Sequence, residues 1–140
     1  MAAPNIVNVT SILGKSVQAT LDTTLTTEIL ACASNKVLKI NSITIANIDG
    51  SSSADVSVFI TKSGGSPIAI ASTIAVPADS SLSLINKNTG FYLEESDNIE
   101  AGASANGDLT ITISYEEIDV APAQNSYFNR DKYYLLKVVV

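Results

Sequence analysis

The residues closest to a catalytic arrangement are Glu95 and Asp97, in the stretch YLEESDNIEA. Residues two apart on an extended strand share a face, which would place their Cβ atoms about 6–7 Å apart, a spacing that permits the paired-acid chemistry of glycosidases. Ser96 and Asn98, which flank Asp97, are instead typical of an exposed turn, and such a turn offers no apolar pocket to keep one carboxyl group protonated. We therefore predict no active site here and no enzymatic activity.

The acidic residues around this turn could also bind a cation. Calcium takes carboxylate oxygens from loops, and the candidate ligands are Glu94, Glu95, Asp97, Glu100 and Asp108. The spacing of an EF-hand is absent, and the adjacent pairs Glu94-Glu95 and Glu116-Glu117 would point to opposite faces of a strand. We predict a solvated acidic rim without a bound metal, in which Glu95 and Asp97 are the weak candidates.

Other catalytic and cofactor chemistry lacks its residues. The sequence has no histidine, which removes Ser-His-Asp and Cys-His catalysis and most zinc sites. No Gly-rich loop follows a strand and opens a helix, so no cofactor is expected. Cys32 is the single cysteine and lies among small apolar residues in EILACAS, which predicts a buried thiol rather than a nucleophile.

The charge of the chain limits its partners. The formal net charge is −6, whereas nucleic acids and anionic membranes attract clustered lysine and arginine. We predict neither as a partner. The opening MAAPNIVNV has no basic residue followed by an apolar run, and apolar stretches stop well short of the roughly 20 residues that span a bilayer. We expect a protein made in the host cytoplasm.

Alternation of apolar and polar residues, the signal of β-strands, recurs along the chain. It is clearest in GDLTITISYEE and ADVSVFIT. In KVLKINSITIAN the apolar parity changes after Ile40, which predicts a β-bulge near Asn41-Ser42. Further strands are expected in NIVNVTSIL, SVQATL, TEILACA, PIAIASTIAV, SLSLINK and GFYLEE.

Turn signals such as Asn88-Thr89-Gly90 and Asn106-Gly107-Asp108 separate these segments. Eight or nine short strands at this spacing indicate an all-β domain. The predicted fold is a single antiparallel β-sandwich of jelly-roll type with an extended C-terminal arm.

The strand pattern stops near Ile118, so we divide the chain into a β-sandwich at 1–118 and a linker with an assembly arm at 119–140. The first part carries 12 acids and 5 bases, net −7, and the second carries 2 acids and 3 bases, net +1. A spacer with Pro122 leads to a β-prone apolar segment, which could add a strand to a sheet edge of a neighbouring subunit. The alternative is an arm that folds back over an edge of its own sandwich. The residues expected at the subunit interface are Tyr127, Phe128, Tyr133, Tyr134, Leu135, Leu136, Val138, Val139 and Val140.

A glycan-binding surface would need aromatic rings on which sugars stack. The body has no tryptophan, and its aromatic residues are Phe59, Phe91, Tyr92 and Tyr115. Phe91 and Tyr92 are adjacent, so one is expected in the core and the other at the surface. Phe59 falls on the face opposite Val58, where it would be exposed or would cover a second sheet.

Five segments resemble small virion structural proteins of tailed bacteriophages, especially cyanophages and other marine phages. They are MAAPNIVNVTSILGK, INSITIANIDG, VPADSSL, YLEESD and SYEEI, at 1–15, 40–50, 76–82, 92–97 and 114–118. The likeness covers nearly the whole β-body and leaves the stretch from Asp119 onward outside it.

This resemblance implies a non-enzymatic component of the virion. Such a protein would be a capsid decoration or cement protein, or a piece of the neck, collar or tail. The expected partners are further copies of the chain, as a homo-oligomer, and other virion proteins. The alternative function is a module that binds glycans or another host-surface ligand and is displayed on the virion.

Overall fold

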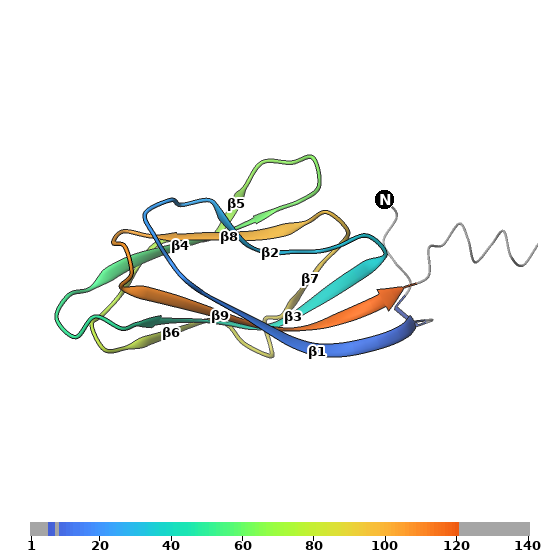
Figure 1. The fold of residues 1–140 in the computed structure, drawn as a ribbon, viewed down its shortest axis with the longest axis horizontal. Helices are drawn as coiled ribbons and strands as arrows, with labels where there is room; N and C mark the ends of the chain where they lie inside the picture. The colour runs from blue at the N-terminus through green and yellow to red at the C-terminus, as the bar shows by residue number, and fades with distance from the viewer. Residues whose placement is uncertain (1–5, 8, 121–140) are drawn as a thin grey trace, which may run out of the picture.

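The computed structural model describes residues 6, 7 and 9–120, which form two antiparallel sheets packed face to face (Figure 1). The nine strands are β1 (Val9–Thr20), β2 (Thr27–Ala31), β3 (Lys36–Asn47), β4 (Ala54–Thr61), β5 (Ile68–Val76), β6 (Ser81–Ile85), β7 (Phe91–Leu93), β8 (Asn98–Ala103) and β9 (Leu109–Val120). In this part of the chain no helix is long and apolar enough to cross a membrane.

The strand order identifies the jelly roll. One sheet has the order β1-β9-β3-β6, with β7 also pairing with β3, and the other has the order β2-β8-β4-β5. The chain crosses between the sheets repeatedly, so strands from both ends of the sequence become neighbours, as in the double Greek key of a jelly roll. The prediction of an all-β antiparallel sandwich is confirmed.

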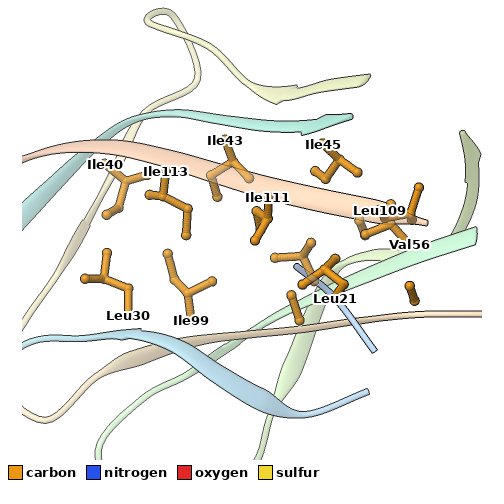
Figure 2. Close-up of a cluster of buried hydrophobic side chains, with 14 of the residues drawn as sticks. Leu21, Leu30, Ile40, Ile43, Ile45, Val56, Ile99, Leu109, Ile111 and Ile113 are labelled. Carbon is orange, nitrogen blue, oxygen red and sulfur yellow. The ribbon is translucent and has the colours of Figure 1, made fainter. Parts of the chain in front are cut away.

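The core lies between the two sheets and is built from the alternating apolar residues (Figure 2). Ile43, Ile45 and Ile111 come from the five-stranded sheet and face Ile99 and Val56 from the four-stranded sheet. All five side chains have no exposed surface. Period-two alternation therefore buries one face of each central strand, as the sequence predicts.

The predicted bulge in β3 is present. The register between β3 and β9 shifts between Ile40 and Ser42, which leaves Asn41 as the extra residue. Because the shift restores the apolar parity, Ile40 and Ile43 both point into the core.

The first strand differs from expectation. NIVNVTSIL and SVQATL were expected as separate strands, but Val9–Thr20 is one strand that continues through Gly14. A Cβ at Gly14 would meet nothing within 4 Å, so this glycine marks no turn or close contact. Pairing with β9 along the whole strand outweighs the break that glycine alone would suggest.

The body extends slightly beyond the expected boundary at Ile118. β9 continues to Val120, whose N–H donates to the carbonyl oxygen of Asn35 at 3.1 Å. Val120, Ile118 and Val37 form a second, smaller apolar cluster, against which Val9 packs. The proposed arm from residue 121 onward lies outside the described residues, so the division into body and arm stays a prediction.

Candidate functional site

Asp97 is not the exposed turn residue that its neighbours suggest. Its side chain is only 2% exposed, and one of its oxygens accepts a hydrogen bond from the backbone N–H of Ser63 at 3.0 Å. The other accepts from the N–H of Glu94 at 2.8 Å and from Nζ of Lys62. The prediction that the whole turn lies in solvent is therefore wrong for this residue.

The environment of Asp97 fixes its protonation state. Burial alone would raise the pKa of Asp97, but the hydrogen bonds from Lys62, Glu94 and Ser63 outweigh burial and hold the pKa below its usual value. Asp97 stays ionised, and its oxygens accept hydrogen bonds from one lysine and two backbone amides. These contacts hold the β4–β5 loop against the turn before β8. Asp97 is therefore a structural ion.

Glu95 does not act as a partner of Asp97. Its Oε2 accepts a hydrogen bond from the backbone N–H of Asn35 at 2.8 Å, across to the turn before β3. Asn35 has a positive φ of 60°, a conformation that asparagine tolerates better than most residues. Each carboxylate thus holds a different loop.

Cys32 is buried, as predicted. Its Sγ donates to the carbonyl oxygen of Lys36 at 3.2 Å, and the residue is 4% exposed. Burial raises the pKa of the Cys32 thiol to about 11, with smaller contributions from the charges of Asp97 and Glu95. A thiol with this pKa is protonated near neutral pH, whereas the thiolate is the nucleophilic form.

The remaining carboxylates do not converge as the calcium hypothesis required. Within the described residues, no three histidine, cysteine or acidic side chains lie close enough to hold a metal ion. Glu94 lies 3.9 Å from Nζ of Lys62, and Glu117 forms ion pairs with Lys15 and Lys36. Glu100 pairs with Glu28 on β2 and with Phe59 on β4.

Among the described aromatic residues, one side chain is exposed at the surface. Phe91 packs against the core and Tyr92 is 46% exposed, so the expected division of this pair is confirmed. Tyr115 is buried, and Phe59 is half-buried on the outer face of the four-stranded sheet. Only Tyr92 offers a face to a ligand among the described aromatic residues.

A hollow on the outer face of the five-stranded sheet lies beside Tyr92. It encloses about 360 Å³ and is lined by Lys39, Asn41, Ser42, Ser83, Ile85, Asn86, Lys87 and Glu116. Lys39 pairs with Tyr92 on one side and with Glu116 on the other. The bulge at Asn41 forms part of the hollow, and the turn at Gly90 approaches it so closely that a Cβ there would lie 2.5 Å from the carbonyl oxygen of Ile40. Sequence reasoning found the bulge but not the hollow, because the turn reaches it only through the fold.

The edges of the sandwich differ in protection. Among the described strands, β1 pairs with β9 alone, and this pairing is regular over residues 11–20. The nine residues of β5 lie opposite residues 54–60 of β4, because the register shifts twice. At one shift Thr73 has a positive φ of 48° and donates its N–H to Oγ of Ser57 at 3.0 Å. Bulges of this kind blunt an edge, whereas β1 has a long regular one.

The residues predicted at the subunit interface, from Tyr127 to Val140, lie outside the described residues. Their role stays a prediction.

No protein-family model matches the chain. No curated protein matches it either. Among solved structures, it is similar to Bacillus endospore appendages, described as a family of disulfide-linked pili, with 17% identity and a TM-score of 0.48 over 79% of this chain and 90% of that one.

The chain is also similar to capsid chains of infectious bursal disease virus. The T13 viral particle matches with 10% identity and a TM-score of 0.41, over 81% of this chain and 32% of that one. The VP2 subviral particle matches with 10% identity and a TM-score of 0.36, over 81% and 39%. This chain therefore spans well under half of the viral chains. All three likenesses are distant and concern the fold, at identities too low to indicate a shared activity.

Proposed function

We propose that the chain is a non-enzymatic structural protein of a tailed-phage virion. It forms homo-oligomers and docks on the particle, as a capsid decoration protein or as a component of the neck, collar or tail. The five segments that resemble small phage virion proteins support this function. A jelly roll whose candidate catalytic carboxylates are occupied by structural contacts is consistent with it.

The observation that carries the proposal is the edge of β1, which pairs with β9 alone among the described strands. An edge strand presents unpaired N–H and C=O groups that can pair with another chain, and proteins usually blunt such edges with charges, prolines or bulges. β1 has twelve residues with Lys15 as its one charge. Ile12 and Leu13 are 56% and 50% exposed on it. Such an edge is suited to pairing with a second subunit.

The C-terminal arm supplies the second contact in this proposal. Its aromatic and apolar residues would add to a sheet edge of a neighbouring subunit, with alternate side chains in pockets. The arm carries net charge +1 by sequence and the body carries −7, which favours its approach to an acidic surface. Folding back onto its own sandwich is the competing arrangement.

The test is the solution mass of the full chain, by size-exclusion chromatography with light scattering over a range of concentrations. We expect a defined oligomer. The double variant Ile12→Lys, Leu13→Lys should dissociate it, because two lysines on the edge repel their counterparts. Ile68→Lys on the blunted edge of β5 is the matched control, since Ile68 is 67% exposed and its replacement should leave the mass unchanged.

The solution mass of a shortened chain that ends at Val120 shows how much the arm contributes to self-association. A folded monomer from this shortened chain and an oligomer from the full chain would support an assembly arm. A full chain that stays monomeric at every concentration would refute self-association. A shortened monomer that unfolds more readily than a monomeric full chain would favour the arm that covers its own body.

A second candidate function, glycan binding, is favoured by the hollow beside Tyr92. Amides, hydroxyls and an exposed aromatic ring are the groups that bind sugars in water. A glycan array probed with the full chain tests this function, with Tyr92→Ala as the variant that should lose any signal. An array without signal would remove it.

A further inference from the structure

A bulge in β2 brings two glutamates face to face on the outside of the four-stranded sheet. β8 pairs Glu100 with Glu28 and Ile99 with Leu30, so the register shifts between Glu28 and Leu30. Leu30 and Ile99 are buried in the core. Because successive strand residues point to opposite faces, Glu100 lies on the outer face, and the shift puts Glu28 beside it. Without the bulge, Glu28 would share the inner face with Leu30.

This pair of carboxylates has no basic partner among the described residues. Like charges directly opposite on neighbouring strands destabilise a sheet. Lys15, Lys36 and Lys62 form ion pairs elsewhere in the structure. Lys39 and Lys87 line the hollow on the other sheet.

The same patch also holds buried oxygens without a hydrogen-bond partner. Across the described residues, the buried side-chain oxygens or nitrogens without such a partner are Oε2 of Glu100, Oδ1 of Asn98 and Oγ1 of Thr61, each less than 1 Å² exposed. Thr61 pairs directly with Asn98, and Asn98 lies two residues before Glu100 on the same face of β8. A buried polar group without a hydrogen-bond partner destabilises the fold.

A hydrogen bond joins Asn98 to the glutamate pair. Nδ2 of Asn98 donates to Oε2 of Glu28 at 3.3 Å, so its amide already reaches the glutamate pair. On its other side, Glu100 pairs with Phe59 of β4; Glu100 and Phe59 are half-buried, whereas Glu28 is exposed. The patch therefore combines two negative charges with oxygens that lack donors.

We propose that Glu28, Glu100, Asn98 and Thr61 form a binding site for a divalent cation, most suitably calcium. Two carboxylates, an amide oxygen and a hydroxyl are hard oxygen ligands. The cation would remove the repulsion between the glutamates and satisfy the three buried oxygens together. The outer face of these strands offers no histidine or cysteine ligand, so zinc and copper are unsuited to it.

The site has a structural consequence. β2 is a short edge strand that pairs with β8 alone among the described strands. A cation held by Glu28 on β2, by Asn98 and Glu100 on β8 and by Thr61 on β4 would join three strands of one sheet. Calcium accepts irregular geometry and several waters, whereas magnesium requires a near-ideal octahedron. With two carboxylates, we expect a dissociation constant of about 10⁻⁴–10⁻³ M, as in extracellular calcium modules.

The test uses the full chain after dialysis against EDTA. Isothermal titration calorimetry with CaCl₂, and thermal unfolding with and without 10 mM CaCl₂, are compared with potassium chloride of equal ionic strength, which corrects for charge screening. We expect saturable binding and a rise in Tm of about 3 °C with calcium. Magnesium should bind more weakly.

The variants decide whether this patch is the site. Glu100→Gln and Glu28→Gln should each abolish the rise in Tm and weaken binding at least tenfold. In EDTA they should melt no lower than the unchanged protein, because each removes the repulsion. Glu116→Gln on the other sheet makes the same charge change and should keep the calcium response. If Glu100→Gln fails to fold, Glu28→Gln on the exposed edge strand carries the test. A calcium response equal to that of potassium chloride, or one that survives both glutamine variants, would overturn the proposal.

Discussion

Replacing Asp97 should cost more stability than any other carboxylate change in the body. Asp97→Ala leaves the N–H groups of Ser63 and Glu94 without an acceptor, at about 1–3 kcal/mol each. The ion pair adds less than about 1 kcal/mol, because the Lys62 side chain is 56% exposed. We expect a loss of about 3–5 kcal/mol in the free energy of unfolding, or roughly 10 °C in Tm. Asp97→Asn keeps one acceptor oxygen and should lose about 2 kcal/mol.

The stability that Asp97 contributes should depend on pH in a defined direction. The pKa of Asp97 is lowered in the folded protein, so its ionised form contributes stability above the unfolded pKa of about 4, and this contribution is lost as pH falls through the folded pKa. The difference between the unchanged protein and Asp97→Asn should be constant from about pH 5 to 8 and should shrink below about pH 4.

Urea unfolding followed by circular dichroism at pH 7 and pH 3 measures both quantities. Glu94→Gln is the matched control, because its contact with Lys62 is a long 3.9 Å pair at the surface; it should change stability by less than about 0.5 kcal/mol. An Asp97→Asn variant within that same range at pH 7, or one whose deficit is unchanged at pH 3, would show that the three hydrogen bonds do not matter as described.

The remaining predictions concern the thiol, two glycines and one strained residue. Cys32 should resist a thiol reagent at pH 8 until urea unfolds the chain, since burial raises its pKa to about 11; rapid labelling of the folded protein would contradict this. Gly102→Ala should lower the free energy of unfolding by about 3 kcal/mol or more, because its Cβ would lie 2.5 Å from Cα of Leu25. Gly14→Ala should leave the free energy of unfolding unchanged, because its Cβ would meet nothing within 4 Å. Equal melting temperatures of the two variants would refute this difference. Thr73→Asn should raise Tm by a few degrees, because asparagine tolerates the φ of 48° better than a β-branched residue; a lower Tm would contradict the strain.

The fold was predictable because its determinants are local and repetitive. Alternation along Leu109–Val120 and the change of parity after Ile40 follow from which side chains must be buried, and burial dominates the free energy of folding. The merging of two expected strands through Gly14 was not predictable, because it depends on the partner strand β9.

The details of the sites required the tertiary structure. Asp97 has the neighbours of a turn residue, and only the fold brings Lys62 and Ser63 to it from 34–35 positions away. Glu28 shares the parity of Leu30 in the sequence, so alternation alone would place it inside. The bulge that turns it outward beside Glu100 is set by pairing with β8, which no local pattern encodes.

The unequal edges of the sandwich bear on the size of any assembly. A subunit with two sheet edges able to pair keeps one edge free after each copy is added. Such an assembly can grow without limit into a fibre. In this jelly roll the pairing of the edge strands β2, β5 and β6 is interrupted by register shifts, while β1 pairs regularly over residues 11–20. Two copies that pair β1 with β1 across a two-fold axis would leave neither of these regular edges free. Under the proposed β1 pairing the assembly would close as a dimer instead of growing into a fibre, and its other surfaces would stay free to contact a larger scaffold.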